Sequence, residues 1–217
     1  AARSRVERVW KAFVGAEAVS FADAAYRGKR IVLTSALAGE LAILTRRLLR
    51  LARSDRRTRD YTFNTLQRAL TEIIGSFPVY RTYIADSGMS KQDRRYLLWA
   101  LGRARAQARG ADASVFDFLG SVLLCEPPTH AAATFASEAR SIALRFQQLT
   151  APVTAKGIED TAFYSYNRLV SLNDVGGDPE QFGLSVNAFH AATRRRATRW
   201  PHTMLATSTH DNKRSED

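Results

Sequence analysis

A histidine and an aspartate stand side by side near the end of the chain, where their side chains could bind a ligand. The segment Thr207–Asp217 contains His210 and Asp211, and it follows the short apolar run His202–Ala206. We expect Thr203–Ser208 to form a strand, so that the pair lies where this strand ends. Because an aspartate accepts hydrogen bonds from two hydroxyl groups and a histidine donates one, the pair suits a polyhydroxylated ligand. The carboxyl ends of strands are also where barrel enzymes hold their chemistry.

A second polar cluster follows another short apolar segment. Ala151–Ala155 reads as a strand, and Lys156, Glu159 and Asp160 come directly after it. In a barrel, the ends of both strands would face the same mouth. A local ion pair between Lys156 and Glu159 would contribute about 0–1 kcal/mol if exposed. The alternative reading is that these polar residues only cap loops, as Asp readily does in turns.

The part of the chain before these clusters is helical. Leucines recur at steps of three and four residues and predict one long amphipathic helix. These leucines are Leu33, Leu37, Leu41, Leu44, Leu48 and Leu51. A second helix is predicted to begin near Asp60, whose carboxylate can cap it, and to end before Pro78. Ser90 and Asp93 resemble a capping box at the start of a further helix.

The pattern changes near residue 150 and gives the fold class. After the strand predicted at Ala151–Ala155 come a loop with Gly176 and Gly177, a helix over Asn187–Arg199 and the second strand. Strand, helix and strand form one βαβ unit, which indicates a parallel sheet or barrel. We therefore predict a mainly α chain in two parts. Residues 1–149 would be a helical subdomain inserted in a barrel, and residues 150–217 a βαβ portion of an incomplete (β/α)8 barrel.

The strong positive charge allows a different class of function. The formal net charge is +11, and 27 of the 32 basic residues are arginines. Clustered arginines such as those in Arg46–Arg59 could neutralise nucleic-acid phosphates. However, they lie at helical spacing between leucines, which is typical of a solvated helix face. We therefore expect a solvated surface and no nucleic-acid partner. A basic helical nucleic-acid-binding module is the alternative.

The sequence lacks the motifs that metal binding, phosphate binding and serine-type nucleophilic catalysis require. The four histidines do not have metal-ligand spacing, there is no glycine-rich phosphate loop, and no nucleophile elbow is present. We therefore expect neither a metal nor a cofactor. The single cysteine, Cys125, fits a reducing compartment, and no apolar run is long enough for a membrane span. These features predict a cytoplasmic protein without a membrane partner.

Several stretches together resemble one enzyme family. Thr209–Asp217 reads Thr-His-Asp-Asn-Lys-Arg-Ser-Glu-Asp and resembles the Thr-His-Asp-Thr-Lys-Arg-Ser-Glu-Asp stretch of maltooligosyltrehalose synthases. Further similar stretches are Lys156–Tyr164, Tyr166–Leu169, Val175–Pro179, Asp55–Asp60 and Phe77–Tyr83. The similarity runs in order from about Tyr26 to the end of the chain. Asn212 departs from the threonine of the family pattern, which affects fine substrate contacts more than the family assignment.

The resemblance implies an enzyme of the alpha-amylase superfamily, with a (β/α)8 barrel that carries inserted helical subdomains. Such enzymes use an aspartate nucleophile, a glutamate acid/base and a second aspartate that stabilises the transition state. Asp211 matches the second aspartate and His210 the adjacent sugar-binding histidine. Lys156 and Glu159 match the pair that closes the pocket near the reducing end. Lys213, in the same stretch as Asp211, is a further expected substrate-binding residue.

The reaction implied by the resemblance is intramolecular transglycosylation of a maltooligosaccharide or α-glucan. No stretch resembles the motifs of the nucleophile or the acid/base, so we expect this chain to be an internal part of a longer enzyme. Alone it would be inactive, and its partner would be the rest of the barrel. A retaining α-glucan hydrolase of the same superfamily is the alternative activity.

Overall fold

The chain folds into helices that form two compact units. A computed structural model describes residues 2–15, 18–85, 87–108, 113–128, 133–209 and 211–214. Within these ranges no β-strand forms, and an isolated bridge joins Ala85 and Gly88. The helical unit comprises Ala22–Ala162, and the terminal unit comprises Ala1–Phe21 with Phe163–Asp217. The predicted mainly α character is confirmed.

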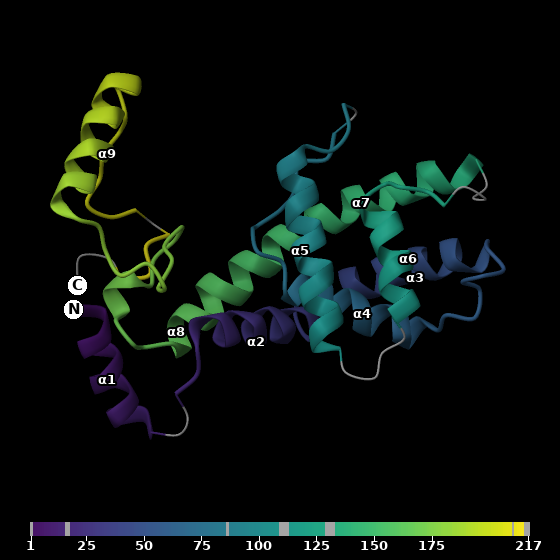
Figure 1. Ribbon diagram of the computed structural model, residues 1–217, viewed down its shortest axis with the longest axis horizontal. Coiled ribbons are helices and arrows are strands. Elements are labelled where there is room, and N and C mark those ends of the chain that lie inside the picture. The colour runs from purple at the N-terminus through teal and green to yellow at the C-terminus, as the bar shows by residue number, and fades with distance from the viewer. Residues whose placement is uncertain are drawn as a thin grey trace. The chain divides into compact units, whose positions relative to one another are not determined.

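The helical unit has one hydrophobic core shared by six helices (Figure 1). They are α2 (Phe21–Thr34), α3 (Ala38–Arg53), α4 (Phe63–Gly75), α5 (Lys91–Gln107), α6 (Ala113–Leu123) and α7 (Ala133–Thr154). Helix α3 packs against α4 and α7, α4 packs against α5, and α6 packs against α7. Fully buried side chains such as Leu48, Ile73, Leu97, Leu119 and Phe146 fill the space between them. Burial of each such side chain stabilises the fold by about 1.5–3 kcal/mol.

The leucine stripe belongs to two helices, so the prediction of a single helix was wrong. Helix α2 ends at Thr34 and α3 begins at Ala38. The hydroxyls of Thr34 and Ser35 donate hydrogen bonds to the carbonyls of Arg30 and Ile31, at 2.9 and 2.6 Å. Such side-chain hydrogen bonds compete with the helix for backbone groups. The spacing of the leucines survives the break because the turn between the helices is short.

Two helix starts show how local chemistry sets the helix ends. Thr62, and not Asp60, caps α4, because the hydroxyl of Thr62 accepts a hydrogen bond from the amide of Thr65 at 3.2 Å. The side chain of Asp60 is 96% exposed. The predicted cap at Ser90 is confirmed, since its hydroxyl accepts from the amide of Asp93 at 3.0 Å. Side-chain caps of this kind stabilise a helix by about 1 kcal/mol.

The strand predicted at Ala151–Ala155 is helical, so that prediction was wrong. Helix α7 continues through Pro152 to Thr154 and passes directly into a π-helix, η2 (Ala155–Ala162). Proline normally disrupts a helix, because it lacks an N–H. Here the apolar face outweighs this cost: Val153 continues the buried row of Ile142, Phe146 and Leu149 at steps of three and four residues. The helix also crosses residue 150 without a break, and the domain division placed there stays a prediction.

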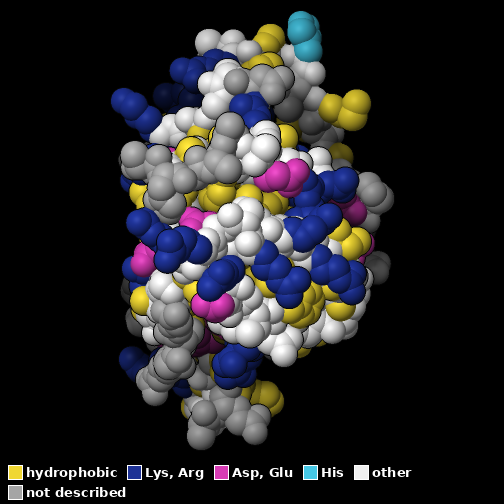
Figure 2. Space-filling view, turned by 90° about the vertical axis from the view of Figure 1, so that its right-hand side faces the viewer, with side chains coloured by type: hydrophobic (Ala, Val, Ile, Leu, Met, Phe, Trp, Pro, Cys, Tyr) yellow, Lys and Arg dark blue, Asp and Glu magenta, His cyan; other side chains and the backbone are white. Residues whose placement is uncertain are grey.

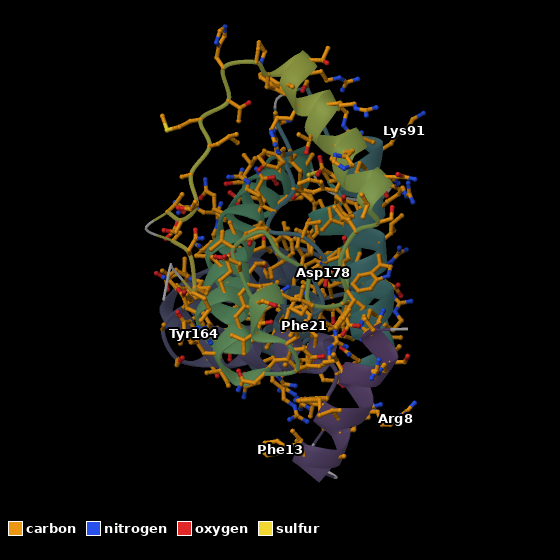
Figure 3. The ribbon with its side chains drawn as sticks, turned by 90° about the vertical axis from the view of Figure 1, so that its left-hand side faces the viewer. Arg8, Phe13, Phe21, Lys91, Tyr164 and Asp178 are labelled. Carbon is orange, nitrogen blue, oxygen red and sulfur yellow. The ribbon has the colours of Figure 1, made fainter. Side chains whose placement is uncertain are left out.

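The terminal unit packs around aromatic side chains. Its helices are α1 (Ala2–Val14), α8 (Phe163–Ser165), the 3-10 turn η3 (Val170–Leu172) and α9 (Val186–Arg199). The ring of Tyr166 lies 5.4 Å from the rings of both Trp10 and Phe21. By contrast, Phe13 on α1 is 91% exposed and stands clear of this cluster (Figure 3).

The predicted helix over Asn187–Arg199 is confirmed as α9, with Ser185 as its cap. The second predicted strand is wrong: the backbone of Thr203–Ser208 is irregular, and Met204 is 94% exposed. No described helix combines the length and the apolar character that crossing a membrane requires.

Candidate functional site

The π-helical turn η2 separates the two predicted site residues that it carries. Lys156 is exposed, and its Nζ lies 2.7 Å from Oδ2 of Asp160, one turn further along. Glu159 is 9% exposed and is largely covered within the helical unit. The ion pair expected between Lys156 and Glu159 therefore does not form, because the two side chains leave the turn on different faces.

Tyr80 takes the place of Lys156 as the partner of Glu159. Its phenol donates a short hydrogen bond to Oε1 of Glu159, across 79 positions of the sequence. Burial, helped by this hydrogen bond and by the negative charge of Glu159, raises the pKa of Tyr80 well above its ordinary value. The phenol is therefore protonated and able to donate at any physiological pH. Tyr80 lies in a family-like stretch, Phe77–Tyr83, but the motifs indicate no role for it.

A close backbone crossing fixes the position of η2. Gly28 of α2 meets Gly157 of η2, and a Cβ added to Gly28 would lie 2.1 Å from the carbonyl oxygen of Gly157. A Cβ on Gly157 would lie 2.6 Å from the Cα of Lys29. Only glycine allows backbones to approach this closely. The turn that carries Glu159 is thereby held against α2.

Lys29, next to this crossing, is buried and points into the helical unit. Its side chain is 4% exposed, and Nζ donates a hydrogen bond of 2.6 Å to the carbonyl oxygen of Phe77. Burial lowers the pKa of Lys29 to about 8. The side chain links α2 to the start of the stretch that carries Tyr80.

In the terminal unit, a tight turn presents Asp211. Oδ1 of Asn212 accepts hydrogen bonds from the amide and the hydroxyl of Thr209, at 3.1 and 2.7 Å. The amide of Asn212 donates in turn to the carbonyl of Thr209 at 3.1 Å. The carboxylate of Asp211 is exposed within this turn. His210 lies outside the described residues, so its role stays a prediction.

The Val175–Pro179 stretch and its neighbours support this turn. Oδ1 of Asp174 accepts a hydrogen bond from the amide of Lys213 at 3.3 Å. The guanidinium of Arg214 lies 5.2 Å from the ring centre of Tyr164, within range of a cation–π interaction. Lys213 and Arg214 of the Thr209–Asp217 stretch are thus held by Asp174, which precedes one family-like stretch, and by Tyr164, which ends another. A substrate contact of the Lys213 side chain stays a prediction.

Asp211 and Lys213 lie in the terminal unit, whereas Lys156 and Glu159 lie in the helical unit. Their meeting at one barrel mouth therefore stays a prediction. Among the described residues no group of three or more His, Cys, Asp or Glu side chains could hold a metal ion.

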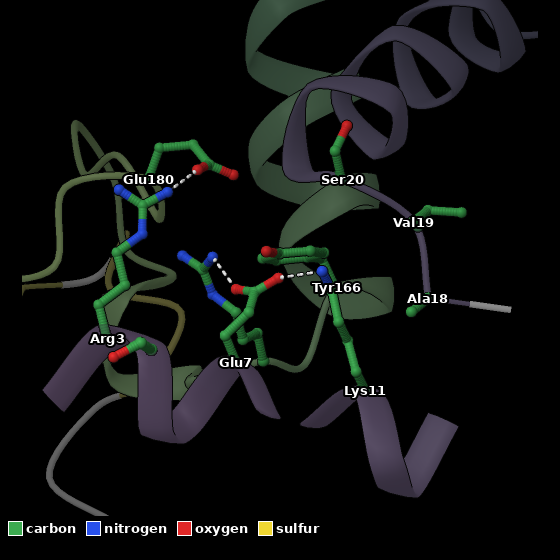
Figure 4. Close-up of a pocket in the computed structure, with 10 residues that line it drawn as sticks. Arg3, Glu7, Lys11, Ala18, Val19, Ser20, Tyr166 and Glu180 are labelled. Carbon is green, nitrogen blue, oxygen red and sulfur yellow. Dashed lines mark hydrogen bonds and ion pairs between the residues drawn. The ribbon is translucent and has the colours of Figure 1, made fainter. Parts of the chain in front are cut away.

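The terminal unit also contains a cavity of about 670 Å³ beside Tyr166 (Figure 4). Its charged side chains pair with one another: Arg3 with Glu180 at 2.8 Å, and Lys11 with Glu7 on the same helix, α1, at 3.3 Å. Arg168 also binds Glu7, at 2.8 Å, and this hydrogen bond is the main reason that the pKa of Glu7 is lowered. None of the predicted site residues that the structure describes lines this cavity.

On the face shown in Figure 2, the described basic side chains do not form one uninterrupted patch. Figure 2 shows Lys and Arg side chains interspersed with apolar, acidic and uncharged ones on the face that it displays. Several arginines of the helical unit pair with carboxylates: Arg30 with Glu72, Arg47 with Glu138, Arg94 with Glu126 and Arg105 with Asp117. This arrangement matches a solvated helical surface.

The fold is that of part of a glycosyltrehalose synthase. A solved structure of the DSM5389 glycosyltrehalose synthase matches 97% of this chain with a TM-score of 0.58 and 20% identity, and the match covers 22% of that chain. The Sulfolobus tokodaii hypothetical maltooligosyl trehalose synthase matches 97% of this chain with a TM-score of 0.60 and 21% identity, over 23% of its own length. At these identities the comparison establishes the fold.

The sequence is similar to proteins named maltooligosyl trehalose synthase. Two from Mycobacterium tuberculosis, of strains CDC 1551 / Oshkosh and ATCC 25618 / H37Rv, are 52% identical to this chain over 75 residues. These residues make up 35% of this chain and 10% of the length of each relative. No protein-family model matches the chain. The resemblance to maltooligosyltrehalose synthases inferred from the motifs is confirmed.

Proposed function

We propose that this chain is part of an intramolecular transglycosylase, an isomerase that acts on maltooligosaccharides in trehalose biosynthesis. The enzyme would convert the α-1,4 linkage at the reducing end into an α,α-1,1 linkage. The 52% identity over 75 residues to proteins named maltooligosyl trehalose synthase carries this proposal. The family-like stretches around Glu159 and Asp211 support it.

In this reaction the bond between the last glucose and the rest of the oligosaccharide breaks, and a covalent glycosyl-enzyme intermediate forms. The acid/base protonates the departing glucose oxygen. The retained glucose turns, and its anomeric hydroxyl attacks the intermediate while the same base takes up its proton. Retaining chemistry of this kind needs two carboxyls only about 5 Å apart. These two residues would lie in parts of a longer protein, so we propose that the 217-residue chain alone is inactive.

Asp211 would bind ring hydroxyls of the sugar that carries the developing positive charge. This interaction strengthens as the ring flattens towards an oxocarbenium ion, and it therefore stabilises the transition state more than the substrate. His210 and Lys213 would orient the same ring. Lys156 and Glu159 would close the pocket around the released glucose, since water that entered would hydrolyse the intermediate.

Product analysis of the full-length protein that contains this chain tests the proposal. Incubation with maltohexaose should give a non-reducing product of the same mass, seen as loss of reducing ends without release of glucose. Release of one glucose for each bond broken would instead identify the retaining α-glucan hydrolase. The separate 217-residue chain should give neither product.

A nucleic-acid-binding module remains the second candidate, because the net charge is +11. Binding through phosphates weakens steeply as salt increases. Duplex DNA that is retarded by the chain at 50 mM salt and released at 200 mM would favour this candidate, and no retardation at low salt would remove it.

A cytoplasmic location is proposed from the reducing environment that a single cysteine fits.

A further inference from the structure

We propose that Tyr80 is the positioning residue for Glu159, holding its carboxylate in the orientation that keeps the released glucose in the pocket. This inference rests on the proposed function and extends it to a residue for which the motifs indicated no role. Tyr80 does not itself contact the reacting atoms in this proposal. It acts by fixing a group that does.

The contact between the two side chains is direct. Glu159 is 9% exposed, and its Oε1 accepts the hydrogen bond of the Tyr80 phenol. A carboxylate has two oxygens, so this hydrogen bond leaves Oε2 for a hydroxyl of the sugar. A phenol with a fixed direction also stops rotation of the carboxylate about its last bond. The hydrogen bond from Tyr80 therefore offsets part of the free energy that desolvation of the Glu159 carboxylate costs. It also sets the direction of Oε2.

The two nearby lysines bind other groups, so Tyr80 is the residue that hydrogen-bonds to Glu159. The ammonium of Lys156, the nearest cation in sequence, lies 2.7 Å from Asp160. Lys29 is also close to η2, but its Nζ donates to the carbonyl of Phe77. Among the described contacts, the phenol is therefore the hydrogen-bond donor to Glu159.

Tyr80 is suited to this role because its backbone is anchored on both sides. Before it, the carbonyl of Phe77 accepts the hydrogen bond of Lys29. After it, the side-chain amide of Gln147 on α7 binds both backbone groups of Ile84, accepting from its amide at 2.8 Å and donating to its carbonyl at 3.1 Å. Supporting hydrogen bonds of this kind keep a functional side chain in its productive geometry.

The other partner is anchored as firmly. The crossing of Gly28 and Gly157 holds η2, which carries Glu159, against α2. The same helix α2 carries Lys29, which binds Phe77. Both ends of the Tyr80–Glu159 hydrogen bond are therefore tied to one helix, and their separation is set by the core of the helical unit.

Removing the phenol hydroxyl should loosen the grip on glucose without unfolding the protein. In a Tyr80→Phe variant the ring remains, but Oε1 loses its donor and the carboxylate can rotate. Hydrogen bonds to charged groups contribute about 1.5–3 kcal/mol, which corresponds to about tenfold or more in a rate ratio. We therefore expect the ratio of hydrolysis to transglycosylation to rise by about tenfold.

The experiment measures this product ratio in the full-length protein for Tyr80→Phe, Glu159→Gln and the double variant. Tyr83→Phe is the matched control, because Tyr83 lies in the same stretch and is 71% exposed. Tyr80→Phe and Glu159→Gln should each raise the release of glucose, the double variant should add little to either, and Tyr83→Phe should behave as the unmodified protein. Equal melting temperatures would show that the shift is not caused by unfolding.

Each contrary result has its own meaning. If Glu159→Gln raises the release of glucose and Tyr80→Phe does not, the positioning role of Tyr80 is overturned and the proposed function stands. If the unmodified protein forms no non-reducing product, the proposed function fails and this inference with it. A separate check needs no activity: a crystal structure of the full-length protein should show the phenol oxygen of Tyr80 within hydrogen-bond distance of a carboxylate oxygen of Glu159. A larger separation would overturn the contact itself.

Discussion

The ammonium of Lys29 lies 2.6 Å from the carbonyl oxygen of Phe77, in a part of the helical unit where the lysine is 4% exposed. A buried ammonium loses its hydration, and one carbonyl replaces only part of it. The interaction nevertheless joins α2 to the stretch that carries Tyr80. Lys29 thus connects the two backbone segments on which the Tyr80–Glu159 hydrogen bond depends.

The burial of Lys29 predicts that the free energy of unfolding changes with pH in the alkaline range. Its pKa is about 8 in the folded chain and 10.5 when unfolded, so the unfolded chain binds more protons between these values. The free energy of unfolding should therefore rise with pH from about 8 to 10.5, by at most about 3 kcal/mol from this residue. Urea unfolding at pH 7.5, 9 and 10.5 measures the rise.

Lys29→Met is the control for this pH dependence, because it keeps most of the side-chain volume and removes the titrating group. The difference in unfolding free energy between the chain and this variant should change over the same pH range. Tyrosines and other lysines titrate in both proteins and cancel in that difference. A difference independent of pH would mean that Lys29 is not desolvated.

The Gly28–Gly157 crossing predicts that a single methyl group at Gly28 strongly destabilises the helical unit. The added Cβ would meet a backbone oxygen at 2.1 Å, which no side-chain rotation can relieve. Gly28→Ala should lower the free energy of unfolding by about 1–3 kcal/mol or more. Gly102→Ala is the matched control, since Gly102 is exposed on α5 with nothing within 4 Å of an added Cβ. It should stabilise the chain by about 0.5–1 kcal/mol through helix propensity. Equal effects would contradict the close crossing.

The helices could be predicted from the sequence wherever one apolar face decides the structure. The spacing of Val115, Phe118, Leu119 and Val122 predicts one apolar stripe of a helix, and all four are buried on α6. The prediction failed near residue 150 because the short apolar segment Ala151–Ala155 was interpreted as a strand, whereas it continues α7 through Pro152. The buried row that includes Val153 outweighs the missing N–H, and only the packed structure reveals that balance.

The site was predictable in part for a similar reason. Motifs indicated Lys156, Glu159 and Asp211 as candidate site residues, because each lies in a contiguous stretch, and their roles stay predictions. They gave no sign of the Tyr80–Glu159 hydrogen bond or of the burial of Lys29, since these contacts join positions 79 and 48 residues apart. Local spacing carries no information about such pairs.

The turn that holds Asp211 predicts which residues position 212 tolerates. Oδ1 of Asn212 accepts two hydrogen bonds from Thr209. A threonine hydroxyl can also accept, whereas alanine cannot. In the full-length protein, Asn212→Thr should stay within about threefold of the original kcat/KM, and Asn212→Ala should fall by about tenfold, since one or two hydrogen bonds of about 1 kcal/mol each are lost. Equal rates for both variants would show that the turn does not depend on this side chain.

The proposed role of Asp211 predicts a loss of activity without a loss of stability. Its carboxylate is exposed in the turn, so Asp211→Asn should leave the melting temperature of the full-length protein within about 1–2 °C, as expected for a surface substitution. The turnover rate should fall by roughly a thousandfold or more, because the amide cannot stabilise the developing positive charge. Asp174→Ala is the informative comparison, because Asp174 accepts from the amide of Lys213 and would act only by loosening the turn. Its loss should be much smaller than that of Asp211→Asn. Near-normal turnover in Asp211→Asn would remove Asp211 from the catalytic site, and equal losses in the two variants would assign it a purely structural role.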